Sequence, residues 1–202
     1  MPRPADGAEY FGLIICAALF ICGSIVGTAA AGFVFDGNSG IPDYMARYLA
    51  LAGEQSAPGF FLALFNACKY HLIVVFLGFS VFGVFCIPAL SAVRGFFLCF
   101  SISAIVRYFG GDGVFLALAI FGVGAILTIP CLFVLSVQSF SSSLYVLRGM
   151  TAKGRAGALP PSGGGFFRRL CICAAVLAIS ALLDTLLIPR LISLAAVRII
   201  IV

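Results

Sequence analysis

Few residues of this chain have the types and spacing that chemistry requires. Its single histidine, His71, stands beside Lys69 and Tyr70 at the edge of an apolar run. As a general base, His71 would need a nucleophile within hydrogen-bond reach, and no serine lies close to it in the sequence. We therefore favour a structural interpretation over a catalytic one: His71 is a polar side chain at the level of the lipid headgroups.

Asp184 is the one carboxylate inside a long apolar run. An unpaired charge inside a membrane costs several kcal/mol, so such a residue is a functional hypothesis by default. The alternative is structural, because Pro189 and Arg190 follow closely and Asp184 could reach headgroup water, pair with a basic residue or stay protonated. A single acid makes a poor proton relay, which favours the structural interpretation.

The eight cysteines predict neither a metal site nor a set of disulfides. Nearly all lie in apolar runs, where cysteine behaves as a small apolar residue. Cys171 and Cys173 have one residue between them, whereas redox and zinc pairs have two. The sequence also has no histidine pair of the metalloprotease type, no phosphate-binding glycine–lysine loop and no carboxylate pair. We expect no enzymatic activity, no metal and no cofactor.

Composition indicates where such a chain resides. Of its 202 residues, 63% are hydrophobic and only 9% are charged, whereas soluble domains carry about 25% charged residues. Most of the surface must therefore face lipid. We predict an all-α, polytopic integral membrane bundle in which residues 1–202 form one domain. The net charge of +5 is spread between apolar runs, so it predicts membrane orientation and no nucleic-acid partner.

The lengths of the apolar runs predict where the helices lie and which of them cross the membrane. A helix rises 1.5 Å per residue and hydrocarbon is about 30 Å thick. The run at 58–70 is short, which predicts an interfacial or re-entrant helix. The tail after Pro189 is left open: it either crosses the membrane or forms a short membrane-associated helix. About five transmembrane helices are expected, at residues 10–34, 71–92, 95–109, 114–137 and 170–188.

Two connections separate these spans. Residues 36–57 hold three acidic residues and one arginine, whereas residues 141–169 hold five basic residues and no acidic one. Lysine and arginine accumulate in cytoplasmic loops. We therefore expect residues 141–169 and the N-terminus in the cytoplasm and residues 36–57 outside.

Small residues predict close helix packing. Gly23, Gly27 and Ala31 recur every four residues in the first span, and such a stripe lets two helix backbones approach closely. Gly78 and Gly83 are expected to act similarly in the second span. The pattern does not tell whether the neighbouring helix belongs to this chain or to a partner.

A series of glycine, proline and charged positions extends from Asn66 to Pro189: Asn66 to Lys69, Gly78-Phe79, Gly83, Arg94-Gly95-Phe96, Phe109-Gly110 to Gly113, Ile129-Pro130, and Asp184 followed by Pro189. With these features, the stretch from Lys69 to Phe140 resembles the central region of the stage II sporulation protein M family. The chain departs from the family in two places: it has Gly122-Val123-Gly124 in place of a proline and polar residues, and Asp184 where the family usually has glutamate.

This resemblance implies a non-enzymatic membrane scaffold in endospore formation. Such a scaffold holds cell-wall-degrading partners, stage II sporulation proteins D and P, at the septal or engulfing cell membrane. Tyr44, Tyr48 and Leu51 could form one docking face of a short helix, or the tyrosines could anchor it at the interface. The alternative is a small-solute permease, which requires several polar residues to converge within the membrane. A third interpretation, an intramembrane hydrolase, is disfavoured by the lone histidine.

Overall fold

The computed structural model describes residues 4–37, 60–151 and 165–200, and it contains no strand in these ranges. The helices are α1 (Pro4–Gly37), α3 (Phe60–Gly78), α4 (Gly83–Phe109), α5 (Gly111–Ala117), the π-helical turn η1 (Leu118–Gly122), α6 (Val123–Thr151) and α7 (Gly165–Ile200). In the described residues, four helices contain a stretch long and apolar enough to cross a membrane: α1, α4, α6 and α7. The predicted all-α membrane bundle is therefore confirmed.

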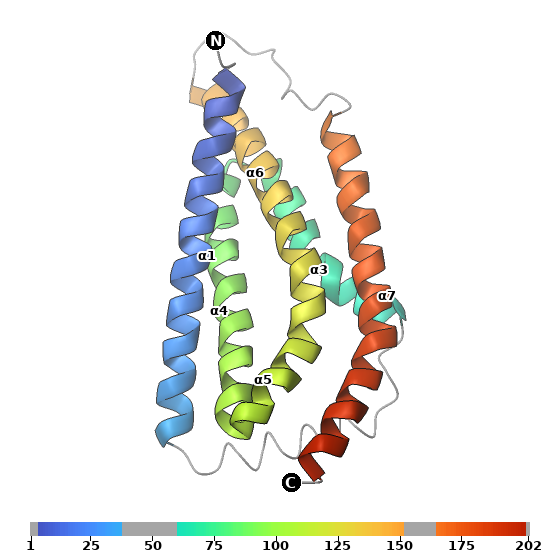
Figure 1. Ribbon diagram of the computed structural model, residues 1–202. Coiled ribbons are helices and arrows are strands. Elements are labelled where there is room, and N and C mark those ends of the chain that lie inside the picture. Colours follow the sequence, from blue (N-terminus) through green and yellow to red (C-terminus); the bar gives the residue numbers. More distant parts are fainter. Residues whose placement is uncertain (1–3, 38–59, 152–164, 201–202) are drawn as a thin grey trace.

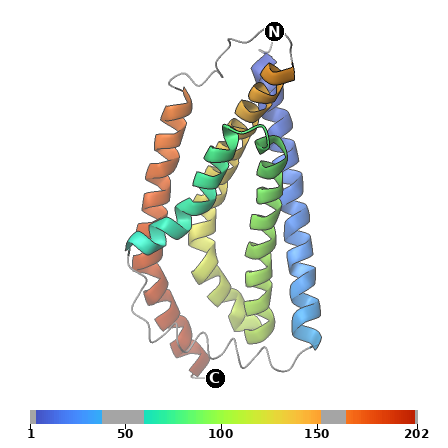
Figure 2. The same cartoon turned by 180° about the vertical axis from the view of Figure 1, so that it is seen from behind.

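The long helices run side by side along the bundle. At one end α1 begins, α6 ends and α7 begins, whereas α1 and α7 both end at the other (Figure 1). Seen from behind, α3 slants from beside α7 up to the start of α4 (Figure 2), and it packs against α6, α7 and α4. Glu9 of α1 and Arg169 of α7 form an ion pair of 3.9 Å at the shared end.

The predicted span at residues 71–92 is wrong, because the chain reverses within it. Helix α3 ends at Gly78 and α4 begins at Gly83. In the turn between them, backbone hydrogen bonds join residues three apart in the chain instead of four. The Ser80 amide donates to the Leu77 carbonyl, and the Gly83 amide donates to the Ser80 carbonyl. The Ser143 hydroxyl of α6 donates to the Ser80 carbonyl at 2.6 Å and so stabilises the reversal.

Other predicted boundaries also change. The expected interfacial helix at 58–70 and the first residues of the expected second span form one helix, α3, and the expected span at 95–109 is the second half of α4. The expected span at 114–137 begins in α5, passes η1 and continues in α6 to Thr151. The span at 170–188 lengthens to α7, which passes Pro189 without ending.

The predicted connections are correspondingly shorter than expected. Residues 141–151 belong to α6 and residues 165–169 to α7, since the serines after Phe140 continue the helix. Residues 36 and 37 complete α1. The rest of both predicted connections lies outside the described residues.

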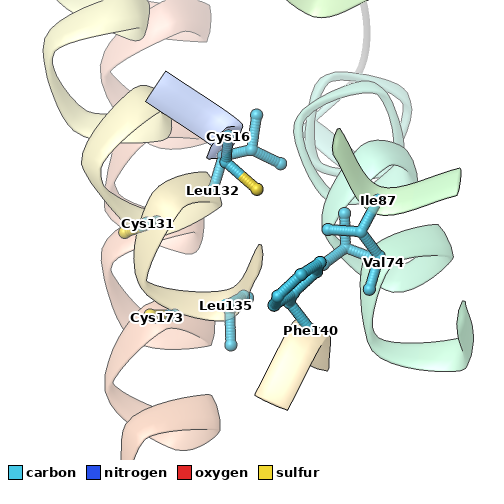
Figure 3. Close-up of a cluster of buried hydrophobic side chains, with 8 residues drawn as sticks. All are labelled: Cys16, Val74, Ile87, Cys131, Leu132, Leu135, Phe140 and Cys173. Atoms are coloured by element: carbon cyan, nitrogen blue, oxygen red, sulfur yellow. The ribbon is translucent and has the colours of Figure 1, made fainter. Parts of the chain in front are cut away.

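Two apolar clusters hold the bundle together at different levels. The larger one receives side chains from five helices (Figure 3): Cys16, Val74, Ile87, Cys131, Leu132, Leu135, Phe140 and Cys173. The smaller one joins Ile105 of α4 to Leu116 and Ala117 of α5. Many other large apolar side chains, such as Ile25 and Phe85, remain exposed, as expected of a surface that faces lipid.

Candidate functional site: a polar cavity between the helices

A cavity of about 440 Å³ lies between α3, α4, η1, α6 and α7, a size typical of ligand pockets. Both polar and apolar side chains form its wall, and we call it the polar cavity. It is lined by Ala67, Lys69, Tyr70, Arg94, Phe97, Leu98, Ser101, Ile120, Phe121, Gly124, Ala125, Thr128 and Asp184.

Two cations of the polar cavity gather around one aromatic ring. The ammonium nitrogen of Lys69 lies 5.3 Å from the centre of the Tyr70 ring, and the guanidinium carbon of Arg94 lies 4.9 Å from the same point. Cations are attracted to the negative face of an aromatic ring, the more so where water is excluded. Tyr70 therefore interacts with both positive charges at the cavity wall.

Asp184 brings a carboxyl group to the same cavity from α7. A side-chain carbon added to Gly124 would lie 3.0 Å from an oxygen of the Asp184 carboxyl group, so the glycine of α6 provides the room that this group occupies. Asp184 has no hydrogen bond or ion pair with the residues that the structure describes. The cavity thus combines two basic side chains and one acidic side chain from three helices.

The polar cavity lies deep in the bundle. Along α4, Ile87 belongs to one apolar cluster and Ile105 to the other, and the cavity-lining residues Arg94 to Ser101 lie between them. Along the chain from α5 to α6, the order is the same, with residues 120–128 between the two clusters. Charged side chains at this depth are expensive, and proteins that retain them usually use them.

His71 is part of the helix framework. Its side chain is only 5% exposed, so it packs against protein and is not presented on the surface of the bundle. One ring nitrogen lies 2.9 Å from the Ala67 carbonyl oxygen of its own helix, and the other lies 3.1 Å from the Thr128 carbonyl oxygen of α6. The neutral ring can donate to one of these two acceptors, and His71 lies between α3 and α6 next to the cavity.

The small residues of α1 lie against α4 of the same chain. A side-chain carbon on Gly23 would overlap the carbonyl group of Ala92, and one on Gly27 would overlap the carbonyl group of Phe96. Gly95 of α4 approaches the Phe20 carbonyl group of α1 in the same manner. Ala31 continues this stripe and is fully buried.

Gly78 and Gly83 lie against α6. A side-chain carbon on Gly78 would lie 2.7 Å from the side chain of Ser139, and one on Gly83 would lie 2.8 Å from the Ser143 hydroxyl oxygen. Ser139 and Ser143 are both fully buried. The two glycines lie on either side of the α3–α4 turn, and each leaves room for one serine of α6.

The remaining predicted site residues have no described position. Tyr44, Tyr48 and Leu51, the expected docking face, lie outside the described residues. The eight cysteines are free. The structure shows no group of three or more metal-binding side chains among the residues it describes.

Sequence reasoning missed the cations of the polar cavity. It placed Lys69 and Tyr70 at a helix end and Arg94 between two spans, because a charge inside an apolar run usually marks a boundary. A usable signal was present: Arg94, Phe97, Leu98 and Ser101 recur at the three- and four-residue spacing of one helix face. That face becomes visible only when α4 is seen as one continuous helix.

Comparisons with protein-family models, with curated proteins and with solved structures found no significant match to this chain.

Proposed function

We propose that this chain is a non-enzymatic membrane scaffold of endospore formation. It would hold peptidoglycan-degrading partners, stage II sporulation proteins D and P, at the septal or engulfing cell membrane. The proposal starts from the resemblance of residues 69–140 to the stage II sporulation protein M family. The observation that best supports it is that glycines in this stretch lie at close contacts between helices.

Three of those glycines are contact points between helices. Gly78 and Gly83 lie against serines of α6, and Gly95 lies against the backbone of α1. Helices that pack through such small residues hold a fixed arrangement in lipid, which is what a scaffold requires. His71 is buried between two backbone carbonyl groups, and its neutral ring can donate a hydrogen bond to one of them, which also favours a structural role over acid–base catalysis.

Charge supports a membrane orientation. Arg168 and Arg169 begin α7 at the same end of the bundle where α1 begins (Figure 1). The positive-inside rule assigns this end to the cytoplasm, so the N-terminus would be cytoplasmic. The chain would then present residues 36–57 to the outer side of the membrane, where cell-wall enzymes act.

Pull-down from sporulating membranes tests the scaffold. We expect the tagged chain to recover lytic cell-wall enzymes, and we expect a Tyr44→Ala/Tyr48→Ala double variant to recover several-fold less while inserting into the membrane normally. A Tyr10→Ala variant, altered on the exposed start of α1, is the matched control. Absence of such enzymes from the wild-type sample, together with solute uptake by liposomes that contain the protein, would overturn the proposal.

The polar cavity favours a second candidate, a small-solute permease. Polar residues from several helices converge beside the π-helical turn η1 and the α6 helix that contains Pro130, and broken helices often form transport sites. Asp184→Asn separates the two candidates. A scaffold would keep complex assembly and engulfment in this variant, whereas a permease that couples transport to Asp184 would lose uptake.

A further inference from the structure

Asp184 brings hydrogen-bond acceptors to the polar cavity that no described residue uses. Its carboxyl group lines the cavity, and its two oxygens lie 3.0 and 3.3 Å from the place that a side-chain carbon of Gly124 would take. The group has no hydrogen bond or ion pair with the residues that the structure describes. An ionised carboxylate only accepts hydrogen bonds, and a polar group inside a membrane is costly while its hydrogen bonds are unmade. The cavity therefore suits a ligand that donates hydrogen bonds.

The charges of the cavity wall favour a neutral donor. Lys69 lines the cavity but has a further interaction of its own, so its charge is not counted as available to a ligand. Arg94 and Asp184 then present one group of each sign to the same space. A cationic ligand would be repelled by the guanidinium and an anionic one by the carboxylate, more strongly than in water. A neutral ligand meets neither repulsion.

Hydroxyl groups match both kinds of polar group in the wall. Each hydroxyl donates one hydrogen bond and can accept others, so it can donate to Asp184 and accept from Arg94. Arg94 hydrogen-bonds to Tyr70 and lies over its ring, which leaves further N–H groups among the five of a guanidinium. The Thr128 hydroxyl donates to the Gly124 carbonyl at 2.8 Å, so its oxygen can accept a hydrogen bond from a ligand.

The apolar part of the wall indicates the shape of the ligand and its entry. The rings of Phe97 and Phe121 line the cavity, and aromatic rings offer large apolar surfaces. A cyclic polyol can place a C–H face on such a ring while its hydroxyl groups reach the polar wall. Phe97 is also 53% exposed on α4, so it lies where the cavity meets the lipid-facing surface.

We propose that the polar cavity binds a neutral ring that carries several hydroxyl groups, as sugars do. Asp184 accepts hydrogen bonds from these hydroxyl groups, Arg94 donates to their oxygens, and Phe97 packs against the C–H face at the entrance. The ring belongs either to a free sugar or to the headgroup of a glycolipid, and the chemistry of recognition is the same for both. The binding requires neither the scaffold nor the permease function, so its test is independent of both.

The test uses the full-length protein in phosphatidylcholine nanodiscs, free of sugar-based detergent, and follows binding by calorimetry. Three probes are titrated: methyl glucoside, dioctanoyl glucosylglycerol, and methyl glucoside with all its hydroxyl groups O-methylated, which keeps the oxygen acceptors and loses the donors. We expect at least one of the two hydroxyl-bearing probes to bind about tenfold or more tightly than the O-methylated probe. Comparable binding of these two probes assigns the site to a free sugar, whereas a clear preference for the second assigns it to a glycolipid.

Variants locate the binding. Asp184→Asn is expected to weaken binding of the preferred probe about tenfold, because hydrogen bonds to a charged acceptor are lost. Glu9→Gln makes the same chemical change outside the cavity, where Glu9 pairs with Arg169, and should leave binding unchanged. Phe97→Ala, at a half-exposed position, gives a second variant with a several-fold loss expected, and thermal unfolding verifies that each variant is folded.

Three outcomes would overturn the proposal. The first is failure of both hydroxyl-bearing probes to bind, and the second is equal binding of these probes and the O-methylated one. The third is an equal response of Asp184→Asn and Glu9→Gln, which would place the binding outside the cavity.

Discussion

Helix α4 has two faces that differ in how closely they meet their neighbours. Towards α1 it is in backbone contact, since Gly95 approaches the Phe20 carbonyl group while Gly23 and Gly27 receive the carbonyl groups of Ala92 and Phe96. Towards α3, α6 and α7, the next turn of the same helix borders a cavity of about 440 Å³. Two adjacent residues lie on these two faces: Gly95 packs against α1, and Arg94 lines the cavity.

The contrast shows how a membrane bundle can keep a charged space open. Apolar side chains gain no hydrophobic energy by leaving lipid for the protein interior, so helix association depends on close packing. The α1–α4 contact supplies that packing, and the two apolar clusters add to it above and below the cavity. The cavity face is then free to carry groups that contribute little to stability.

The largest expected effect is on the packed face. Gly23→Ala places a methyl group against the Ala92 carbonyl group, and the two backbones must separate. We expect a loss of about 1–3 kcal/mol, as for other overpacked interiors, measured by thermal unfolding in detergent. Gly149→Ala is the control, because nothing lies within 4 Å of a side-chain carbon there. An equal response of both variants would contradict the close α1–α4 contact.

An increase in stability, of intermediate size, is expected at the cavity. Asp184→Asn removes a charge that has no ion-pair partner among the described residues, so the folded protein should gain up to about 1 kcal/mol. Thermal unfolding measures the change, and Asp184→Glu, which keeps the charge, should show no gain. A loss of stability in the asparagine variant would mean that Lys69 or Arg94 stabilises the carboxylate across the cavity.

The smallest effect is expected where a larger side chain can enter the cavity. Ala125 lines it, so Ala125→Leu should change the unfolding free energy by no more than about 0.5 kcal/mol, within the range of tolerated substitutions. The same substitution at Ala31, which is fully buried on α1, should be clearly destabilising. If the two leucine variants unfold alike, the faces of the bundle do not differ in the way described.

The sequence was sufficient for features that depend on local composition. Apolar runs predicted the helical membrane class, and the four-residue spacing of Gly23, Gly27 and Ala31 predicted a packing face. It was insufficient where distant residues decide the outcome. The reversal at residues 79–82 has no proline, and it is stabilised by Ser143, more than sixty residues away in the chain. In the sequence, Arg94 indicates a helix boundary, because its partner Tyr70 lies on another helix and cannot be identified from local composition.

The dependence of the α3–α4 turn on α6 has a consequence for biogenesis. Within the turn, backbone amides already donate to the Leu77 and Ser80 carbonyl groups, and the Ser143 hydroxyl adds a second donor to Ser80. Ser143 is synthesised well after α4, so the hairpin can form before this hydrogen bond is available. The order of synthesis thus makes α6 the element that completes the turn and fixes it in the bundle.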